Sequence, residues 1–178
     1  MSNEKIITEE IVLTLERLKE VLFYDPDTGI FIWLKNRGSK IKKGDKAGCI
    51  NPFGYIRIKV FGRLYMAHVL AWFYMKEEMP ILDIDHINRI KNDNRWNNLR
   101  LANRSNNTFN KPKNKNNTSG YKGVSYHKIM KKYRAKICVN GKHIILGYKD
   151  TPEEASILYI EASIKYAKEF SIFMQETF

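Results

Sequence analysis

The chain has 178 residues, 43% of them hydrophobic, and its 31 Lys and Arg against 19 Asp and Glu give a formal net charge of +12. This composition supports a folded core and excludes a wholly disordered chain. No apolar stretch approaches the ~20 residues of a membrane-spanning helix, the acidic N-terminus is unlike a secretory signal, and two isolated cysteines exclude a disulfide framework and a four-cysteine zinc site. We therefore expect a reduced, soluble, cytoplasmic protein.

The first part of the chain is predicted to fold into short helices and strands. Apolar residues at helical spacing mark one amphipathic helix, and strict alternation marks a hairpin. The elements expected, in order, are a helix over 8–22 capped by Thr8, a turn over 25–29, a strand over 29–34, a basic loop over 35–46, hairpin strands over 55–61 and 63–66, and a helix over 67–76.

Asparagine dominates the next segment. Twelve of the thirty residues from Asn88 to Asn117 are asparagine, but apolar residues recur among them, which a linker does not need. We expect a strand that ends in Asp85-His86, a long loop, a strand over 99–102 and a short helix that opens near Asn103. Residues 111–119 are polar and basic without an apolar anchor, so they are expected to form a linker.

A second module is predicted from residue 120 onwards. Strands are expected over 122–126, 133–139 and 142–147, the last two joined by the hairpin signal Asn140-Gly141. Thr151, Pro152 and Glu154 form a helix start with a capping box, followed by a helix over 155–170. This helix would cover one face of a three-stranded antiparallel sheet. The fold class expected for the whole chain is α+β.

The positive charge is concentrated in one part of the chain. Between Asp93 and Asp150 there are fourteen Lys or Arg and no acidic residue, whereas residues 1–20 and 151–178 are both net acidic. Such a segment indicates a polyanionic partner. A basic surface that serves only solubility is the alternative.

Asp85, His86 and Asn107 are expected to converge where the strands and the short helix meet. A neutral imidazole is a suitable base for deprotonating water near neutral pH, as phosphodiester hydrolysis requires. A carboxylate and an amide oxygen are hard ligands, which favour Mg²⁺ or Mn²⁺ over zinc. A polar loop with one surface histidine is the alternative interpretation.

Several motifs resemble the HNH endonuclease family, closest to its phage and intron-encoded homing branch with a ββα-metal active site. The core motifs are AHVLAW (67–72), IDHIN (84–88), NDNRWNNLR (92–100) and SNN (105–107) with Asn110, and residues 24–29, 44–48 and 54–55 resemble the preceding part of such phage proteins. The resemblance covers about residues 22–110.

The resemblance implies a role for each matching position. His86 matches the general base, Asp85 the metal-binding carboxylate, and Asn98 the asparagine that ties down the loop and orients the base. Asn107 matches the last metal position, often histidine elsewhere, and whether Asn106 or Asn107 is the ligand stays open. His68, in an apolar helix, is expected to be structural rather than catalytic. One divalent cation, Mg²⁺ or Mn²⁺, is expected.

Residues 118–170 resemble the Apetala-type, ethylene-response-factor DNA-binding domain, through SGYKGV (119–124), YRAKI (133–137), LG (146–147) and TPEEA (151–155). In that family the sheet lies in the major groove. Most of the base-reading arginines of the plant domain are not arginine here, so its specificity does not transfer. The residues expected to contact DNA, including those of the basic linker, are Lys111, Lys113, Lys115, Lys122, Ser125, His127, Arg134, Lys136 and Lys142.

Together these features predict a two-module endonuclease of double-stranded DNA. Its expected domains are an HNH part over 1–110, a linker over 111–119 and an Apetala-type part over 120–178. We expect a sequence-recognising, single-metal enzyme encoded by a phage or mobile element and monomeric in the bacterial cytoplasm. A non-catalytic DNA-binding regulator on a decayed HNH core is the main alternative, and RNA as the polyanion is a further one.

Overall fold

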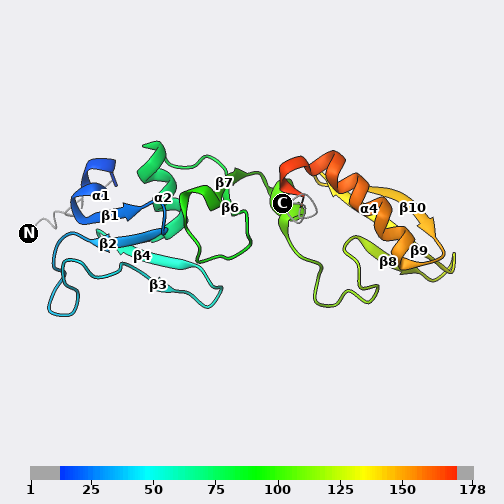
Figure 1. The fold of residues 1–178 in the computed structure, drawn as a ribbon, viewed down its shortest axis with the longest axis horizontal. Helices are drawn as coiled ribbons and strands as arrows, with labels where there is room; N and C mark the ends of the chain where they lie inside the picture. Colours follow the sequence, from blue (N-terminus) through cyan, green and yellow to red (C-terminus); the bar gives the residue numbers. More distant parts are fainter. Residues whose placement is uncertain (1–12, 172–178) are drawn as a thin grey trace, which may run out of the picture. The chain divides into compact units, whose positions relative to one another are not determined.

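The computed structural model describes residues 13–171, which form two compact units. One unit contains the described residues up to 86 together with 90–99, and the other contains 87–89 and the residues from 100 onwards. Both are built from short helices and small antiparallel sheets, so the expected α+β class is confirmed (Figure 1). No helix in this described part of the chain is long and apolar enough to cross a membrane.

The first helix is shorter than predicted. Helix α1 spans Leu15–Val21, and the hydroxyl of Thr14 accepts the N–H of Arg17 at 3.3 Å as its N-cap. Thr14 has an extended backbone, with ψ at 160°, so the helix begins after it. The predicted cap Thr8 lies outside the described residues.

Leu22, expected at the end of that helix, instead opens strand β1 (Leu22–Asp25), which pairs with β2 (Ile30–Trp33). Alternate side chains of this hairpin enter the core, so Leu22, Tyr24, Phe31 and Trp33 are buried. The predicted turn joins the strands, and the Asp25 carboxylate accepts the N–H groups of Asp27 and Thr28.

The predicted central hairpin and helix are confirmed. A three-stranded sheet contains β3 (Cys49–Ile50), β4 (Ile56–Val60) and β5 (Arg63–Met66) in that order. Helix α2 then spans Ala67–Lys76, as expected. The core of the first unit forms where residues of this helix and sheet, such as Leu70 and Ile58, meet the buried residues of α1, β1 and β2.

The asparagine-rich segment folds in the predicted order. Strand β6 (Asp83–His86) is followed by a long loop, the short 3-10 helix η1 (Trp96–Asn98), strand β7 (Leu99–Ala102) and helix α3 (Arg104–Asn110). Strands β6 and β7 form a two-stranded sheet. The side chain of Asn103 caps α3 by accepting the N–H of Asn106 at 2.8 Å.

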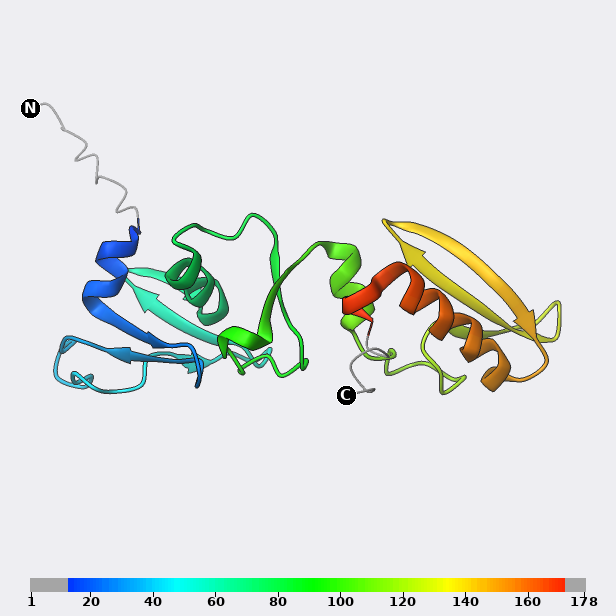
Figure 2. The ribbon, with the colours of Figure 1, turned by 45° about the horizontal axis from the view of Figure 1, so that its top comes forward.

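The second unit contains the predicted sheet and helix. Strands β8 (Val124–His127), β9 (Lys132–Val139) and β10 (Lys142–Lys149) form a sheet with β9 in the middle, and α4 (Pro152–Ala167) lies across one face (Figure 2). The capping box of Thr151 and Glu154 is present. Helix α4 ends at Ala167 rather than Phe170, because Lys168 adopts a positive φ of 48° and a 3-10 turn, η2 (Lys168–Phe170), follows.

Candidate functional site

His86 lies at the end of β6 and is only 5% exposed. Its Nε2 is 3.0 Å from Oδ1 of Asn94, in the loop between β6 and β7. An amide oxygen only accepts hydrogen bonds, so in this arrangement Nε2 carries the hydrogen and Nδ1 is the basic nitrogen. The contact therefore sets both the orientation and the tautomer of the ring.

The loop that carries Asn94 is fixed at several points. The hydroxyl of Tyr24 donates to the main-chain oxygen of Asn94 at 2.7 Å, and the side chain of Asn98 donates to that of Asp93 at 2.7 Å. The N–H of Trp96 also donates to the main-chain oxygen of Pro26 at 2.9 Å, which ties the loop to the β1–β2 turn. Asn94 itself is 1% exposed. The loop is thus a rigid support for His86.

Burial and nearby charge act in opposite directions on His86. Burial lowers the pKa of His86, because a buried ring disfavours the charged form, while the hydrogen bond to Asn94 and the carboxylates of Asp85 and Asp93 raise it. The net pKa lies below the usual histidine value. His86 is therefore neutral near pH 7, the form that accepts a proton.

His68 packs against His86, a neighbour that the sequence pattern did not predict. The two ring centroids are 5.1 Å apart at an interplanar angle of 88°, and Tyr55 contacts both rings at 5.4 and 6.0 Å. Burial, with repulsion from His86, lowers the pKa of His68 to about 4. His68 is therefore uncharged at neutral pH and adds no positive charge beside His86. Its expected structural role stays a prediction.

The expected metal ligands have different surroundings. Asp85 precedes His86 on β6 and is 8% exposed, whereas Asn106 and Asn107 lie on α3, both half-buried. Among residues 13–171 there is no group of three or more His, Cys, Asp or Glu side chains arranged for a metal ion. The donors named by the sequence are one carboxylate and one amide oxygen, which fit a hard divalent cation completed by water and phosphate oxygens.

The residues expected to read DNA lie on the sheet of the second unit. In β9, Ala135 and Ile137 are buried, and Arg134 and Lys136 alternate with them on the other face. Arg134 lies opposite Ser125 in the register, with its guanidinium 3.5 Å from the Ser125 hydroxyl. His127 packs edge-on against Tyr148, with ring centroids 5.4 Å apart. DNA contact by these residues stays a prediction.

The expected phosphate-binding lysines divide into two groups. Lys111, Lys115 and Lys142 are exposed. Lys113 donates to the main-chain oxygen of Gly120 at 2.8 Å, and Lys122 donates to the main-chain oxygens of Thr108, Phe109 and Lys111. These three contacts give Lys122 a structural role that its position in the sequence did not indicate. Side chains within the expected linker also bond to the sheet module, since Asn117 donates to the carbonyl of Tyr121 at 2.9 Å.

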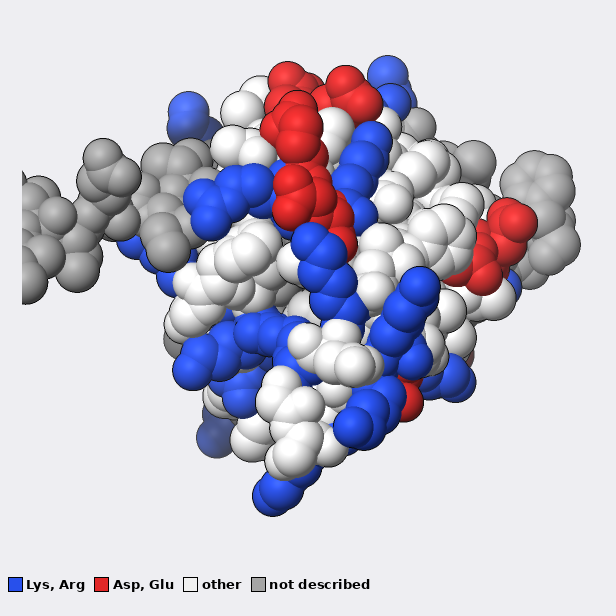
Figure 3. Space-filling view, turned by 90° about the vertical axis from the view of Figure 1, so that its left-hand side faces the viewer, with Lys and Arg blue, Asp and Glu red and all other residues white. Residues whose placement is uncertain are grey.

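A further basic surface belongs to the first unit. The predicted loop over 35–46 carries six Lys or Arg against one acid, Asp45, and most of these side chains are exposed. Arg37 anchors the loop by stacking on Trp33 at 4.3 Å and by donating to the main-chain oxygen of Lys59 at 2.5 Å. Figure 3 shows one face of the molecule with Lys and Arg spread over much of it and with Asp and Glu mainly at the top and at the right-hand side.

Asn98→Ala is expected to reduce the rate of any reaction at His86 by about 10- to 100-fold, the range seen when groups that orient a functional side chain are removed. The reason is that the alanine removes the Asn98 amide that donates to the half-buried Asp93 carbonyl at 2.7 Å, which loosens the loop that holds Asn94. Single-turnover rates would measure it. Asn97→Ala, at the exposed neighbouring position, is the matched control. Equal rates for both variants would contradict the assigned role.

Comparison with known proteins agrees with this geometry in one segment. No curated protein and no solved structure matches the chain. A protein-family model does match part of it, from β5 through α2 and β6 to α3, and this part contains Asp85, His86, Asn98 and Asn107. Residues 65–109 of the chain match the model of the HNH endonuclease family.

Proposed function

We propose that the protein is a DNA endonuclease that hydrolyses phosphodiester bonds at His86. The observation that carries this proposal is the buried imidazole with Nε2 bonded to Asn94, inside the segment that matches the HNH endonuclease model. A neutral, oriented base is what water activation requires, whereas a protein that only binds DNA has no use for it. The fourteen Lys and Arg residues between Asp93 and Asp150 support a polyanionic substrate.

In the proposed mechanism, Nδ1 of His86 takes a proton from a water molecule as its oxygen attacks phosphorus. The bond from phosphorus to the 3′ oxygen breaks, and this oxygen leaves and takes up a proton. Asn94 holds the imidazole by its other nitrogen, and Asn98 holds the loop that carries Asn94. A divalent cation, Mg²⁺ or Mn²⁺ held by Asp85 and Asn107, would supply positive charge for the pentavalent phosphorus and the leaving oxygen.

We further propose that the second unit holds duplex DNA. Contacts to phosphates by exposed Lys111, Lys115 and Lys142 would position the duplex, and base contacts by Ser125, His127, Arg134 and Lys136 would give sequence recognition. The strands of β8, β9 and β10 provide a face opposite α4 for this purpose. A monomeric, phage or mobile-element homing enzyme fits this arrangement, as the resemblance of the sequence suggests.

Removal of divalent metal is expected to abolish cleavage. Purified protein incubated with a mixed pool of phage and bacterial DNA should produce breaks with Mg²⁺ or Mn²⁺, none in excess EDTA, and breaks again when metal is restored, because the leaving oxygen then regains its counter-charge. Native and denaturing gels run in parallel separate nicks from double-strand cuts. Cleavage that continues at the same rate in EDTA would contradict the metal-dependent step.

A further inference from the structure

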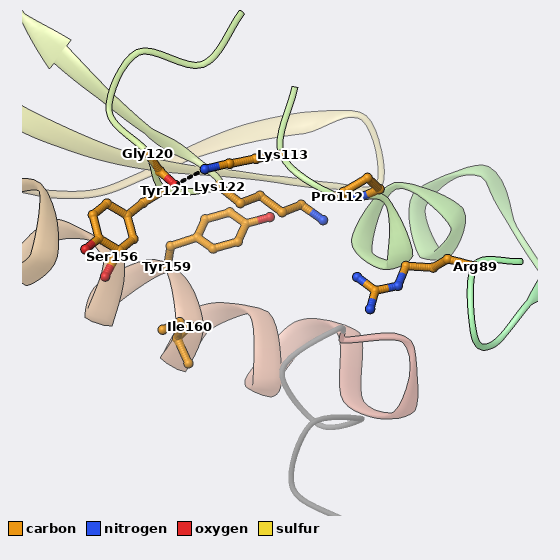
Figure 4. A pocket seen from close by; sticks show the side chains of 9 residues that line it. All are labelled: Arg89, Pro112, Lys113, Gly120, Tyr121, Lys122, Ser156, Tyr159 and Ile160. Carbon is orange, nitrogen blue, oxygen red and sulfur yellow. Dashed lines mark hydrogen bonds between the residues drawn. The ribbon is translucent and has the colours of Figure 1, made fainter. Parts of the chain in front are cut away.

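A cavity of about 240 Å³ opens in the second unit, beside α4 and the segment that precedes β8. Aromatic and aliphatic side chains from Tyr121, Tyr159 and Ile160 form part of its wall (Figure 4). Two lysines and one arginine also line it, namely Lys113, Lys122 and Arg89, and no Asp or Glu does. The cavity therefore combines a partly apolar wall with cationic side chains and no anionic ones.

Lys122 is the most sheltered of the three cations. Its ammonium group donates to three main-chain oxygens around the C-terminal end of α3, those of Thr108, Phe109 and Lys111. Burial, with repulsion from Arg89 and Lys111, lowers the pKa of Lys122 to about 8. All three ammonium protons are already used, so Lys122 would attract an anion through its charge alone.

Arg89 has the opposite character, because its side chain is exposed and its backbone is strained. Its φ is +66°, in the left-handed region that residues other than glycine, asparagine and aspartate seldom adopt. Strain of this kind clusters at functional sites, where the surrounding structure maintains it. Figure 4 shows the guanidinium extending from its loop towards the cavity. Such a group matches the oxygens of a phosphate in a two-pronged hydrogen bond.

Among the side chains that the structure describes, none with a negative charge lines this cavity. No ion pair is formed there by Arg89, Lys113 or Lys122. The carboxylate of Glu153 accepts a hydrogen bond from the hydroxyl of Tyr121, a residue of the cavity wall, at 3.1 Å. Positive charges around one cavity repel each other, as Arg89 and the half-buried Lys122 do here, and a bound anion relieves that repulsion.

We propose that this cavity binds one phosphate of the DNA backbone, with Arg89 and Lys113 as its hydrogen-bond donors. The proposal rests on the proposed function, since it names a contact of the same substrate. The DNA backbone is the favoured source because the exposed Lys111 and Lys115 continue the positive charge along the chain next to the cavity. Lys113 contributes the protons that it does not donate to Gly120. Lys122 fixes the C-terminal end of α3 and adds its charge.

The first test measures the salt dependence of DNA affinity in EDTA, which prevents cleavage in the proposed mechanism. Arg89→Asn removes the guanidinium with a residue that tolerates positive φ, and Arg89→Gly is a second variant free of backbone strain. Each should lower the slope of log affinity against log salt by about 1, the effect of one lost phosphate contact. Lys165→Ala, which removes one exposed charge from α4 away from the cavity, should leave the slope unchanged.

The second test titrates the full chain with inorganic phosphate and follows its amide NMR signals. The expected result is a saturable shift at Lys113, Tyr121 and Lys122 that Arg89→Asn abolishes. Phosphate shifts with an unchanged salt slope would assign the site to free phosphate and overturn the DNA contact. Absence of both effects would overturn the site. If the unaltered protein bound no DNA, the proposed function would fail, and the titration would still decide separately whether the cavity binds phosphate.

Discussion

Replacement of His86 by alanine is expected to lower the rate of DNA cleavage by about 10²- to 10⁴-fold and to leave DNA affinity unchanged. The factor is that of a lost general base. His86 is 5% exposed and bonded to the buried Asn94, so the variant also takes the His86 donor from the Asn94 oxygen, at a cost of about 1–3 kcal/mol of unfolding free energy. The affinity is retained because the charge that attracts DNA lies elsewhere, in the segment between Asp93 and Asp150.

The measurement compares single-turnover cleavage, DNA affinity and thermal unfolding in the variant and in a matched control. His143→Ala is that control, since it removes an exposed histidine from β10 of the second unit. A folded His86→Ala protein that binds DNA but does not cut it would support the base. Cleavage at the unaltered rate would contradict the assignment of His86 as the general base. A parallel loss in His143→Ala would show that the effect is not specific to the site.

Local pattern was sufficient to predict the elements in which one signal dominates. The alternation of Ile56, Ile58 and Val60 is typical of a strand, and β4 is one residue shorter at each end than the predicted strand over 55–61. The bounds predicted for α2 are confirmed. The assignment of Leu22 was wrong, because its spacing of four residues from Leu18 places both side chains on one face of a helix. Pairing with Trp33 across the hairpin places Leu22 in a strand, and that contact is not local in sequence.

In the candidate site, too, contacts between residues distant in sequence could not be predicted from local pattern. Asp85, His86 and Asn98 stand out in the sequence because they fall in recognisable motifs. Asn94 does not, because it is one of twelve asparagines in thirty residues and only its contact with His86 distinguishes it. The packing of His68 against His86 and the three carbonyl contacts of Lys122 depend on tertiary structure, so local pattern had no means of finding them.

The β1–β2 turn supports the site through a close approach of two backbones. Gly29 has a φ of +72°, and a Cβ built on it would lie 2.3 Å from the backbone nitrogen of Arg95 and 2.4 Å from the carbonyl carbon of Asn94. Real Cβ atoms do not come this close to other atoms, so any side chain at position 29 must displace one of the two segments. The displaced segment is the one that holds Asn94 against His86.

Gly29→Ala is therefore expected to cost about 2–5 kcal/mol of unfolding free energy, from about 1–2 kcal/mol for a left-handed alanine and about 1–3 kcal/mol for the overlap. Gly38→Ala is the matched control, because Gly38 has a similar φ of +65° with nothing within 4 Å of the added Cβ. It should cost only the backbone part and leave cleavage unchanged. Denaturant unfolding and cleavage rates measure both. If Gly29→Ala behaved like Gly38→Ala in both respects, the close approach would not matter to the site; a larger loss in both would show that the turn determines where Asn94, and through it His86, is held.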